Sequence, residues 1–244
     1  MACLKIGIDE QREVLRGLQE SVKQSNDIAE ATRREQQTRE EQAQELAYHQ
    51  AFGPYLEHKN RNPPRVAKRC EWFLGHPDFL NWKQEHSALL WVSADPGCGK
   101  SVLSRSIIDE DLAVNEGTFP SVCYFFFKTG SVDQQGSTRC TAALLHQLFS
   151  DRPWLVKHAL APYLWDPNIS QSFAATWDIL IEATSDPTTG EIICVVDALD
   201  ECEEDSRELL IDALKRLYSD TDDSQRVSLK FFVTSQRQHQ CRPS

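Results

Sequence analysis

The chain has 244 residues and a formal net charge of −11 at pH 7, from 37 acidic and 26 basic side chains. This acidic balance disfavours a protein that binds nucleic acid nonspecifically through its phosphates. No apolar run approaches the roughly 18 residues that a membrane span needs, and the N-terminus lacks the apolar core of a secretory signal. The eight cysteines form no Cys-x-x-Cys pair, which favours reduced thiols in a cytoplasmic protein over a zinc site.

The first fifty residues predict a long polar helix. Residues 9–50 contain no proline and one glycine, Gly17, and helix-forming residues dominate them. Val14, Leu18 and Val22 follow one another at four-residue intervals, whereas residues 31–45 are almost without apolar side chains. That stripe is thin for a coiled coil, which needs sustained apolar positions. Two interpretations stay open: a solvated helix that frays, or a helix that binds a partner or forms an oligomerisation stalk.

Prolines and a glycine then mark a domain boundary. Gly53-Pro54 and Asn62-Pro63-Pro64 interrupt regular secondary structure. We therefore expect a helical extension over residues 1–52, with partner binding as one role, and a second domain over residues 65–244. The second domain opens with a short apolar helical face and an aromatic cluster, residues 66–82. This segment either packs on the sheet that follows or also forms one wall of a nucleotide-base pocket.

The stretch Leu89–Ser106, LLWVSADPGCGKSVLSRS, has the order that a phosphate-binding loop requires. An apolar strand-like run leads into a turn, and a helix-like pattern follows, so that backbone N–H groups are directed at one point. The spacing G-x-x-x-x-G-K-[ST] is met at Gly99, Lys100 and Ser101, with Ala94 in place of the first glycine. The expected nucleotide contacts come from Ala94, Pro96, Gly97, Cys98, Gly99, Lys100, Ser101 and Val102.

Three further apolar runs predict buried strands with helical patterns between them. Residues 121–127 and 192–196 are dense in β-branched and aromatic residues, and residues 229–235 form the last run. Helices are expected over 142–149, 154–163, 173–183 and 207–218. Strands that alternate with helices imply parallel β-α units in an α/β protein. Such sheets bind ligands at the carboxyl ends of their strands.

The run 192–196 leads directly into an acidic stretch, Asp197-Ala198-Leu199-Asp200-Glu201. In phosphoryl-transfer sites, a carboxylate at a neighbouring strand end and the hydroxyl that follows the loop lysine hold Mg²⁺. We therefore expect Asp197 and Ser101 to be the Mg²⁺ ligands. A water that attacks the terminal phosphate needs a base, for which Asp200 and Glu201 are candidates. The acids that follow, 203–205, fit the first turn of the next helix.

Taken together, ALLWVSADPGCGKSVLS, the FFFK run, IICVVDALDECEE and LKFFVTSQR resemble the NACHT-type nucleotide-binding module of fungal NOD-like receptors, also described as nephrocystin-like N-terminal. The resemblance covers about residues 65–237. It implies a P-loop NTPase of the STAND class, a switch that is closed with ADP and oligomeric with ATP when a C-terminal repeat domain senses a ligand. It also implies single roles: Lys100 and Ser101 bind phosphate and Mg²⁺, Asp197 binds Mg²⁺, Asp200 and Glu201 polarise water, and Thr234 and Ser235 lie in a sensor strand.

The same resemblance implies a three-layer fold with a mostly parallel sheet of order 2-3-4-1, and a fifth strand that would lie beyond Ser244. The phosphate-loop strand is then an exposed edge that another chain can pair with. We therefore expect the isolated chain to be marginally stable or self-associating unless the N-terminal region covers that edge. The family's Thr-Ser-Arg-Pro sensor reads Thr234-Ser235-Gln236-Arg237 here, which displaces the arginine by one position.

The expected function is a switch module that binds ATP or ADP with Mg²⁺, or GTP, and hydrolyses it slowly at most. Its expected contacts to other chains are self-association or the N-terminal helix. The alternative is a non-catalytic adaptor or decoy that acts through that helix. A metabolic kinase is less well supported, because no basic acceptor-binding lid motif is present. The phosphate loop does not distinguish ATP from GTP, since base selectivity depends on contacts outside it.

Overall fold

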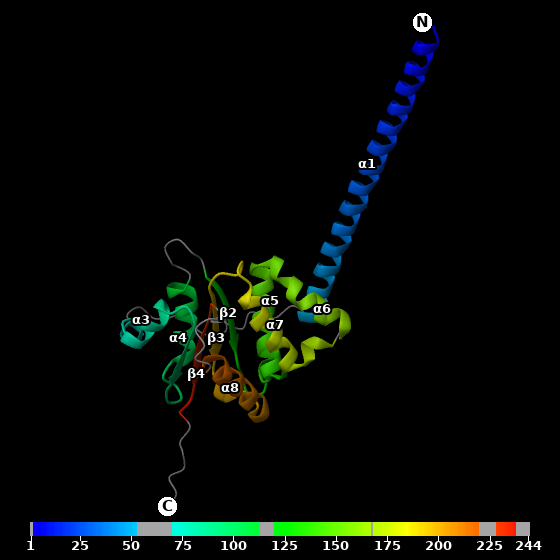
Figure 1. The fold of residues 1–244 in the computed structure, drawn as a ribbon. Helices are drawn as coiled ribbons and strands as arrows, with labels where there is room; N and C mark the ends of the chain where they lie inside the picture. Colours follow the sequence, from blue (N-terminus) through cyan, green and yellow to red (C-terminus); the bar gives the residue numbers. More distant parts are fainter. Residues whose placement is uncertain (1, 53–69, 113–119, 167, 220–227, 238–244) are drawn as a thin grey trace, which may run out of the picture. The chain divides into compact units, whose positions relative to one another are not determined.

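The computed structural model describes residues 2–52, 70–112, 120–166, 168–219 and 228–237 (Figure 1). The chain consists of two compact units, Met1–Leu46 and Ala47–Ser244. Helix α1 (Ala2–Phe52) begins the chain, and its 51 residues correspond to a length of about 75 Å. The long N-terminal helix that the sequence predicts is thus confirmed, whereas the expected boundary, residues 53–64, lies outside the described residues. No helix in the described ranges is long and apolar enough to cross a membrane.

Four parallel strands form the sheet of the second unit, in the order β1-β4-β3-β2. They are β1 (Ala88–Ser93), β2 (Ser121–Phe126), β3 (Ile192–Asp197) and β4 (Leu229–Ser235). The strands β3 and β4 are buried along their whole length, which explains their unbroken apolar runs, because a parallel sheet is covered on both faces. The expected order 2-3-4-1 is confirmed, and the strand that leads into the phosphate loop lies at one edge.

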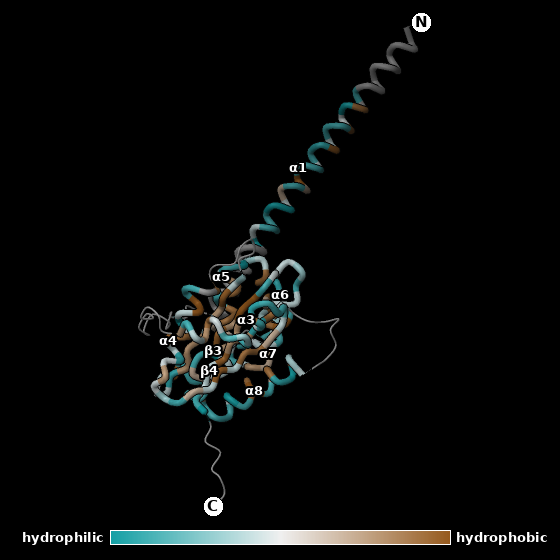
Figure 2. The backbone as a smooth tube through the Cα atoms, turned by 90° about the vertical axis from the view of Figure 1, so that its left-hand side faces the viewer, coloured by the Kyte–Doolittle hydropathy of each residue, from teal (hydrophilic) through white to brown (hydrophobic). Residues whose placement is uncertain are grey.

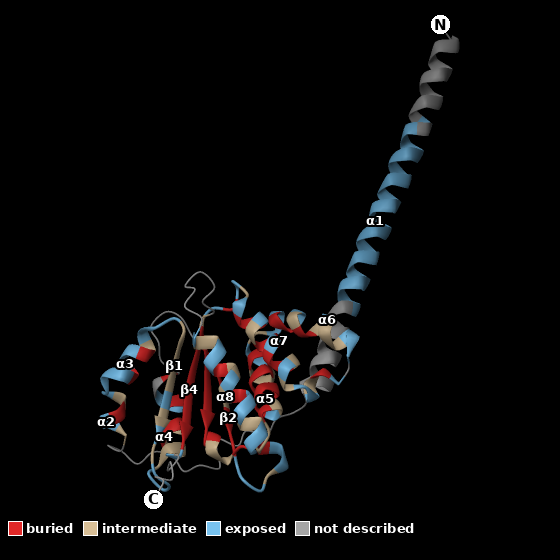
Figure 3. Cartoon of the chain, turned by 60° about the horizontal axis from the view of Figure 1, so that its bottom comes forward, coloured by how far each residue is buried: buried red, intermediate tan, exposed pale blue. Residues whose placement is uncertain are grey.

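Helices cover both faces of this sheet and make a three-layer α/β fold (Figure 1, Figure 3). One face carries α2 (Glu71–Leu74), α3 (Pro77–Gln84) and α4 (Lys100–Ser106), the last of which continues as a π-helical segment, Ile107–Asp111. The other face carries α5 (Ser137–Asp151), α7 (Phe173–Ser185) and α8 (Glu204–Ser219), and α6 (Lys157–Trp165) packs against α7. Short 3₁₀ turns occupy Val132–Gln134, Pro153–Val156, Ile169–Gln171 and Leu199–Glu201.

The hydrophobic core has one part on each face of the sheet. Successive side chains of a strand point to opposite faces, so Phe231 joins the larger part, with α5, α7 and α8, while Phe232 joins the smaller part. In the smaller part, Phe79 and Trp82 of α3 pack with Leu103 of α4. The aromatic segment 66–82 therefore packs on the sheet from Phe73 onward, which is the first of its two interpretations. Figure 2 shows β3 and β4 as hydrophobic segments inside the second unit.

The two edges of the sheet differ in how their backbone groups are satisfied. At β2, the Gln147 side chain accepts the Tyr124 N–H at 3.0 Å and donates to the Tyr124 carbonyl at 2.8 Å. Gln134 donates to the Phe126 carbonyl at 2.7 Å. At β1, the Ala94 N–H donates to the Ser235 carbonyl in β4. The backbone N–H and C=O groups of successive strand residues point to alternate sides, so those of residues 89, 91 and 93 point away from β4. Those groups have no hydrogen-bond partner in the described part of the chain.

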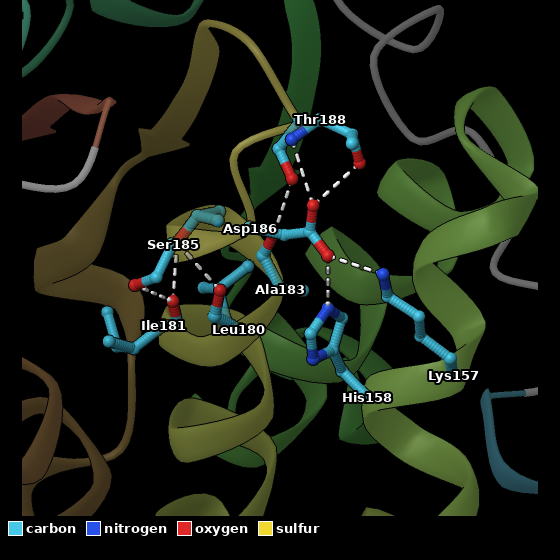
Figure 4. A network of polar contacts seen from close by, with 10 residues as sticks. Lys157, His158, Leu180, Ile181, Ala183, Ser185, Asp186 and Thr188 are labelled. Carbon is cyan, nitrogen blue, oxygen red and sulfur yellow. Dashed lines mark hydrogen bonds and ion pairs between the residues drawn. The ribbon is translucent and has the colours of Figure 1, made fainter.

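A polar network ties the end of α7 to α6 (Figure 4). The Asp186 carboxylate contacts Lys157 Nζ at 2.6 Å and His158 Nε2 at 3.0 Å, both from α6. Its other oxygen accepts the Thr188 N–H at 2.9 Å and the Thr188 hydroxyl at 2.6 Å. The hydrogen bond from Lys157, followed by those from Thr188, holds the pKa of Asp186 well below its usual range. This carboxylate therefore fixes the turn between α7 and β3 in its charged form.

Candidate nucleotide-binding site

The loop that joins β1 to α4, residues 94–99 and hereafter the phosphate loop, has the backbone that its glycines predict. Gly97 and Gly99 have φ angles of 77° and 84°, values that a residue with a β-carbon adopts only at a cost. Ala94, where the motif has its first glycine, is not among the described residues with positive φ. Alanine is therefore tolerated there without backbone strain. Gly99 directly precedes α4, so the loop ends at the amino end of a helix.

Lys100 spans the phosphate loop from the first turn of α4. Its Nζ donates to the carbonyl of Ala94 at 2.9 Å and to the carbonyl of Asp95 at 3.2 Å. The remaining loop residues Pro96, Gly97 and Cys98 are exposed. The ammonium group is thus held over an exposed loop by two neutral acceptors. An anion that enters the loop can replace them, because charge-assisted hydrogen bonds are stronger than those to neutral carbonyls.

Asp197, the last residue of β3, is buried to 1% exposure and is surrounded by hydroxyl groups. Its Oδ1 accepts hydrogen bonds from Ser104 Oγ at 2.6 Å and from Thr234 Oγ1 at 2.7 Å. Burial raises the pKa of Asp197, while hydrogen bonds from Ser101, Ser104 and Thr234 and the charge of Lys100 act in the opposite direction. The helix after the phosphate loop, the acidic strand end and β4 therefore meet at one carboxylate.

Ser104 is a site residue that the sequence analysis did not single out. It lies three residues after Ser101 in α4, and residues at this spacing share one face of a helix. Ser104 donates to Asp197, and the Ser101 hydroxyl lies near enough to lower the pKa of the same carboxyl group. The spacing Ser101-x-x-Ser104, which begins directly after Lys100, is the sequence pattern from which Ser104 could have been predicted.

The two residues of the expected sensor strand point to opposite faces of the sheet. Thr234 Oγ1 accepts the N–H of Ala198 at 3.0 Å and donates to Asp197. Ser235 Oγ instead accepts the indole N–H of Trp91 at 2.8 Å, on the face that carries α8. The structure therefore brings Thr234 to the Asp197 carboxylate and does not bring Ser235 there. Ala198 has φ 55°, a left-handed conformation that is rare for residues other than glycine.

The two candidate bases each bind a backbone N–H that follows a neighbouring strand. Asp200 Oδ1 accepts the N–H of Gln236, directly after β4, at 2.7 Å. Glu201 Oε2 accepts the N–H of Thr129, after β2, at 2.8 Å. The turn from Ala198 to Glu201 therefore connects the carboxyl ends of three strands. A pocket of about 240 Å³ lies beside Asp200, with Trp91 and Arg207 in its wall.

The donor atoms around Asp197 fit Mg²⁺. Ser101 and Asp197 supply a hydroxyl and a carboxylate, both hard oxygen donors, and the Ser101 hydroxyl lies near enough to lower the pKa of Asp197. Mg²⁺ is usually held by one or two carboxylates together with substrate phosphates and water rather than by a complete protein cage. The described residues contain no group of three or more His, Cys, Asp or Glu side chains that could hold a metal ion on their own.

Comparison with known proteins shows which family the chain matches. The family model described as Nephrocystin 3, N-terminal, matches residues 68–236, which include the phosphate loop, Asp197 and β4. The chain belongs to the nephrocystin 3 N-terminal family. It is also 30% identical over 148 residues to the vegetative incompatibility protein HET-E-1 of Podospora anserina, a match that covers 57% of this chain and 10% of that protein.

This chain therefore matches about a tenth of the length of that curated relative. No solved structure matched the chain. The membership in the nephrocystin 3 N-terminal family and the fungal relative both support the resemblance that the motifs indicate, to NACHT-type modules of fungal NOD-like receptors.

Proposed function

We propose that this chain is a nucleotide-binding switch module of the NOD-like receptor kind, which binds ATP or ADP with Mg²⁺ in the cytoplasm. GTP is the alternative nucleotide. The observation that carries the proposal is the convergence of Lys100, Ser101 and Asp197. Lys100 is held over a glycine-containing loop, and the helix that begins with Lys100 and Ser101 contacts the buried Asp197 carboxylate through Ser104.

Each of these residues has a defined part in binding. Lys100 would exchange the carbonyls of Ala94 and Asp95 for phosphate oxygens. The N–H groups of the phosphate loop would donate to the same phosphates, which is how such loops hold anions. Ser101 and Asp197 would hold Mg²⁺, which supplies the positive charge that neutralises the phosphates. Ser104 and Thr234 would keep the Asp197 carboxylate in place, since both donate to its Oδ1.

The turn that follows Asp197 gives a route by which a bound nucleotide would act on the rest of the module. Asp200 holds the backbone after β4, and Glu201 holds the backbone after β2. A shift of Asp197 on Mg²⁺ binding would therefore move segments at both of the neighbouring strands. These hydrogen bonds occupy Oδ1 of Asp200 and Oε2 of Glu201 and leave the second oxygen of each carboxylate to act as a base. Hydrolysis, slow at most, would use one of these two acids.

Ligand-dependent stability tests the proposal. The free energy of unfolding of the full chain is measured with and without Mg²⁺-ATP, Mg²⁺-ADP and Mg²⁺-GTP, in the wild type and in Lys100→Ala. A ligand at 100 times its dissociation constant adds about 2.7 kcal/mol, and Lys100→Ala should abolish this gain. Lys215→Ala is the matched control, because Lys215 is an exposed lysine of α8 that pairs with Asp212. The absence of any gain in the wild type would refute nucleotide binding and favour the adaptor.

Hydrolysis is tested separately from binding. Glu201→Gln keeps the size of the side chain and an acceptor for the Thr129 N–H but removes the carboxylate. We expect this variant to retain the nucleotide-dependent gain in stability and to lose phosphate release. A variant that releases phosphate at the wild-type rate would exclude Glu201 as the base.

A further inference from the structure

The charged residues of α1 recur with a strict period between Glu13 and Arg34. They occupy positions 13, 16, 20, 23, 27, 30 and 34, and Arg33 is the one charged residue of this stretch outside the series. The intervals alternate between three and four residues, which is a period of 3.5 along the helix. Glu30 and Arg34 form an ion pair within this row, and both side chains are largely exposed. The row of charges therefore follows one side of α1.

The opposite side of the helix is free of charge over residues 15–32, up to Arg33, which continues the row of Gln19 and Asn26. We call it the neutral face, and its ten residues are Leu15, Leu18, Gln19, Ser21, Val22, Ser25, Asn26, Ile28, Ala29 and Thr32. Its central line, positions 15, 18, 22, 25, 29 and 32, repeats the same intervals of three and four. Leu15, Leu18, Val22 and Ile28 are 58%, 58%, 59% and 67% exposed. The largest apolar side chains of this segment are therefore in water.

A period of 3.5 is the spacing at which one helix packs along another. A straight helix has 3.6 residues per turn, so a 3.5-residue stripe stays in contact only when two helices wind around each other. A helix without a partner also gains little stability from propensity alone in water, because most helical stability in proteins comes from packing. The neutral face thus has the geometry of a helix–helix seam.

We propose that the neutral face of α1 pairs with α1 of a second copy of this chain. The absence of charge favours a partner helix that has a neutral face of its own, and a second α1 supplies one. Two neutral faces meet without burying or opposing any charge, whereas a charged helix would be desolvated without a counterion. The stretch 15–32 carries two basic and three acidic residues, all on the outer row. It is nearly balanced, although the chain as a whole has a net charge of −11. Thr32 can be buried at low cost, because its hydroxyl already donates to the Ile28 carbonyl at 2.9 Å.

Sedimentation equilibrium of the full chain tests this pairing. We expect the wild type to associate and Leu18→Glu/Val22→Glu to raise the dissociation constant at least about tenfold, a change equivalent to 1.4 kcal/mol. Gln24→Glu/Ala31→Glu is the matched control, since it adds the same two charges on the outer side of α1. Substitutions on such a surface change free energies by about 0.5 kcal/mol or less, so its constant should stay within about twofold. Circular dichroism checks that all variants keep their helix.

A gain-of-function variant makes the test independent of damage to the helix. Ser25→Leu adds an apolar side chain to the central line of the neutral face and should tighten association, while Gln24→Leu should not. Lys100→Ala should associate as the wild type does, which separates this proposal from nucleotide binding. A mass of one chain at every concentration, or association that Leu18→Glu/Val22→Glu leaves unchanged, would overturn the pairing.

Discussion

Replacement of Thr234 by valine tests how the acidic strand end is held. Valine keeps the shape of threonine but removes the hydroxyl that donates to Asp197 at 2.7 Å and accepts from Ala198 at 3.0 Å. The lost bond to the carboxyl group is worth roughly 1.5 kcal/mol, and the orphaned, buried Ala198 N–H costs roughly another 1.5 kcal/mol. We therefore expect Thr234→Val to lower the free energy of unfolding by about 3 kcal/mol.

Urea unfolding, followed by circular dichroism, measures this difference. Thr234→Ser is the matched control, because it keeps both hydrogen bonds and loses one buried methyl group, worth about 0.8 kcal/mol. The expected order of stability is wild type, then Thr234→Ser, then Thr234→Val, with similar dependence on urea concentration. If Thr234→Val is as stable as Thr234→Ser, the hydroxyl does not hold the strand end and the reasoning fails.

Three further predictions concern neighbouring parts of the fold. Ser104→Ala should lower the free energy of unfolding by about 1–2 kcal/mol through the lost hydrogen bond to Asp197. It should also weaken nucleotide binding in Mg²⁺ more than nucleotide binding in EDTA, and an equal effect in both would contradict the role of Ser104 in positioning Asp197. Asp186→Asn should lower the stability of the protein at neutral pH, and the difference from the wild type should shrink as the pH falls below about 4. The reason is that a carboxylate with a lowered pKa stabilises the fold above its unfolded pKa and loses that contribution in acid. A difference in stability that stays constant across a pH titration would argue against the charged network. Gln147→Leu should cost about 1–2 kcal/mol and promote aggregation, measured by light scattering, since it uncovers both backbone groups of Tyr124; a soluble variant of wild-type stability would speak against this covering role.

The sequence alone predicts most of the fold because its signals are local. The apolar runs at β3 and β4 are unbroken since both faces of the strands are covered. The loop from Ala94 to Gly99 needs glycine at two left-handed positions and has it at both. The sheet order came from the family resemblance rather than from any residue pattern, and the structure confirms it.

The contacts of the site could not be predicted in the same way, because they depend on how strands and helices lie against one another. Sequence places Thr234 and Ser235 side by side, but the pleat of β4 sends them to opposite faces, one to Asp197 and one to Trp91. The backbone partners of Asp200 and Glu201 lie 36 and 72 residues away along the chain. The left-handed conformation of Ala198 has no local signal, because alanine is not a residue that favours it.

The unequal edges of the sheet limit what strand pairing between molecules can build. Gln147 and Gln134 occupy backbone groups of β2 that a neighbouring strand would need, while the outward groups of β1 have no partner in the described part of the chain. A fibre grows only from molecules with two available edges, since each added molecule must offer a new one. Molecules that join through β1 use up the edge that would recruit a third. Association by this route therefore ends at a pair and does not propagate.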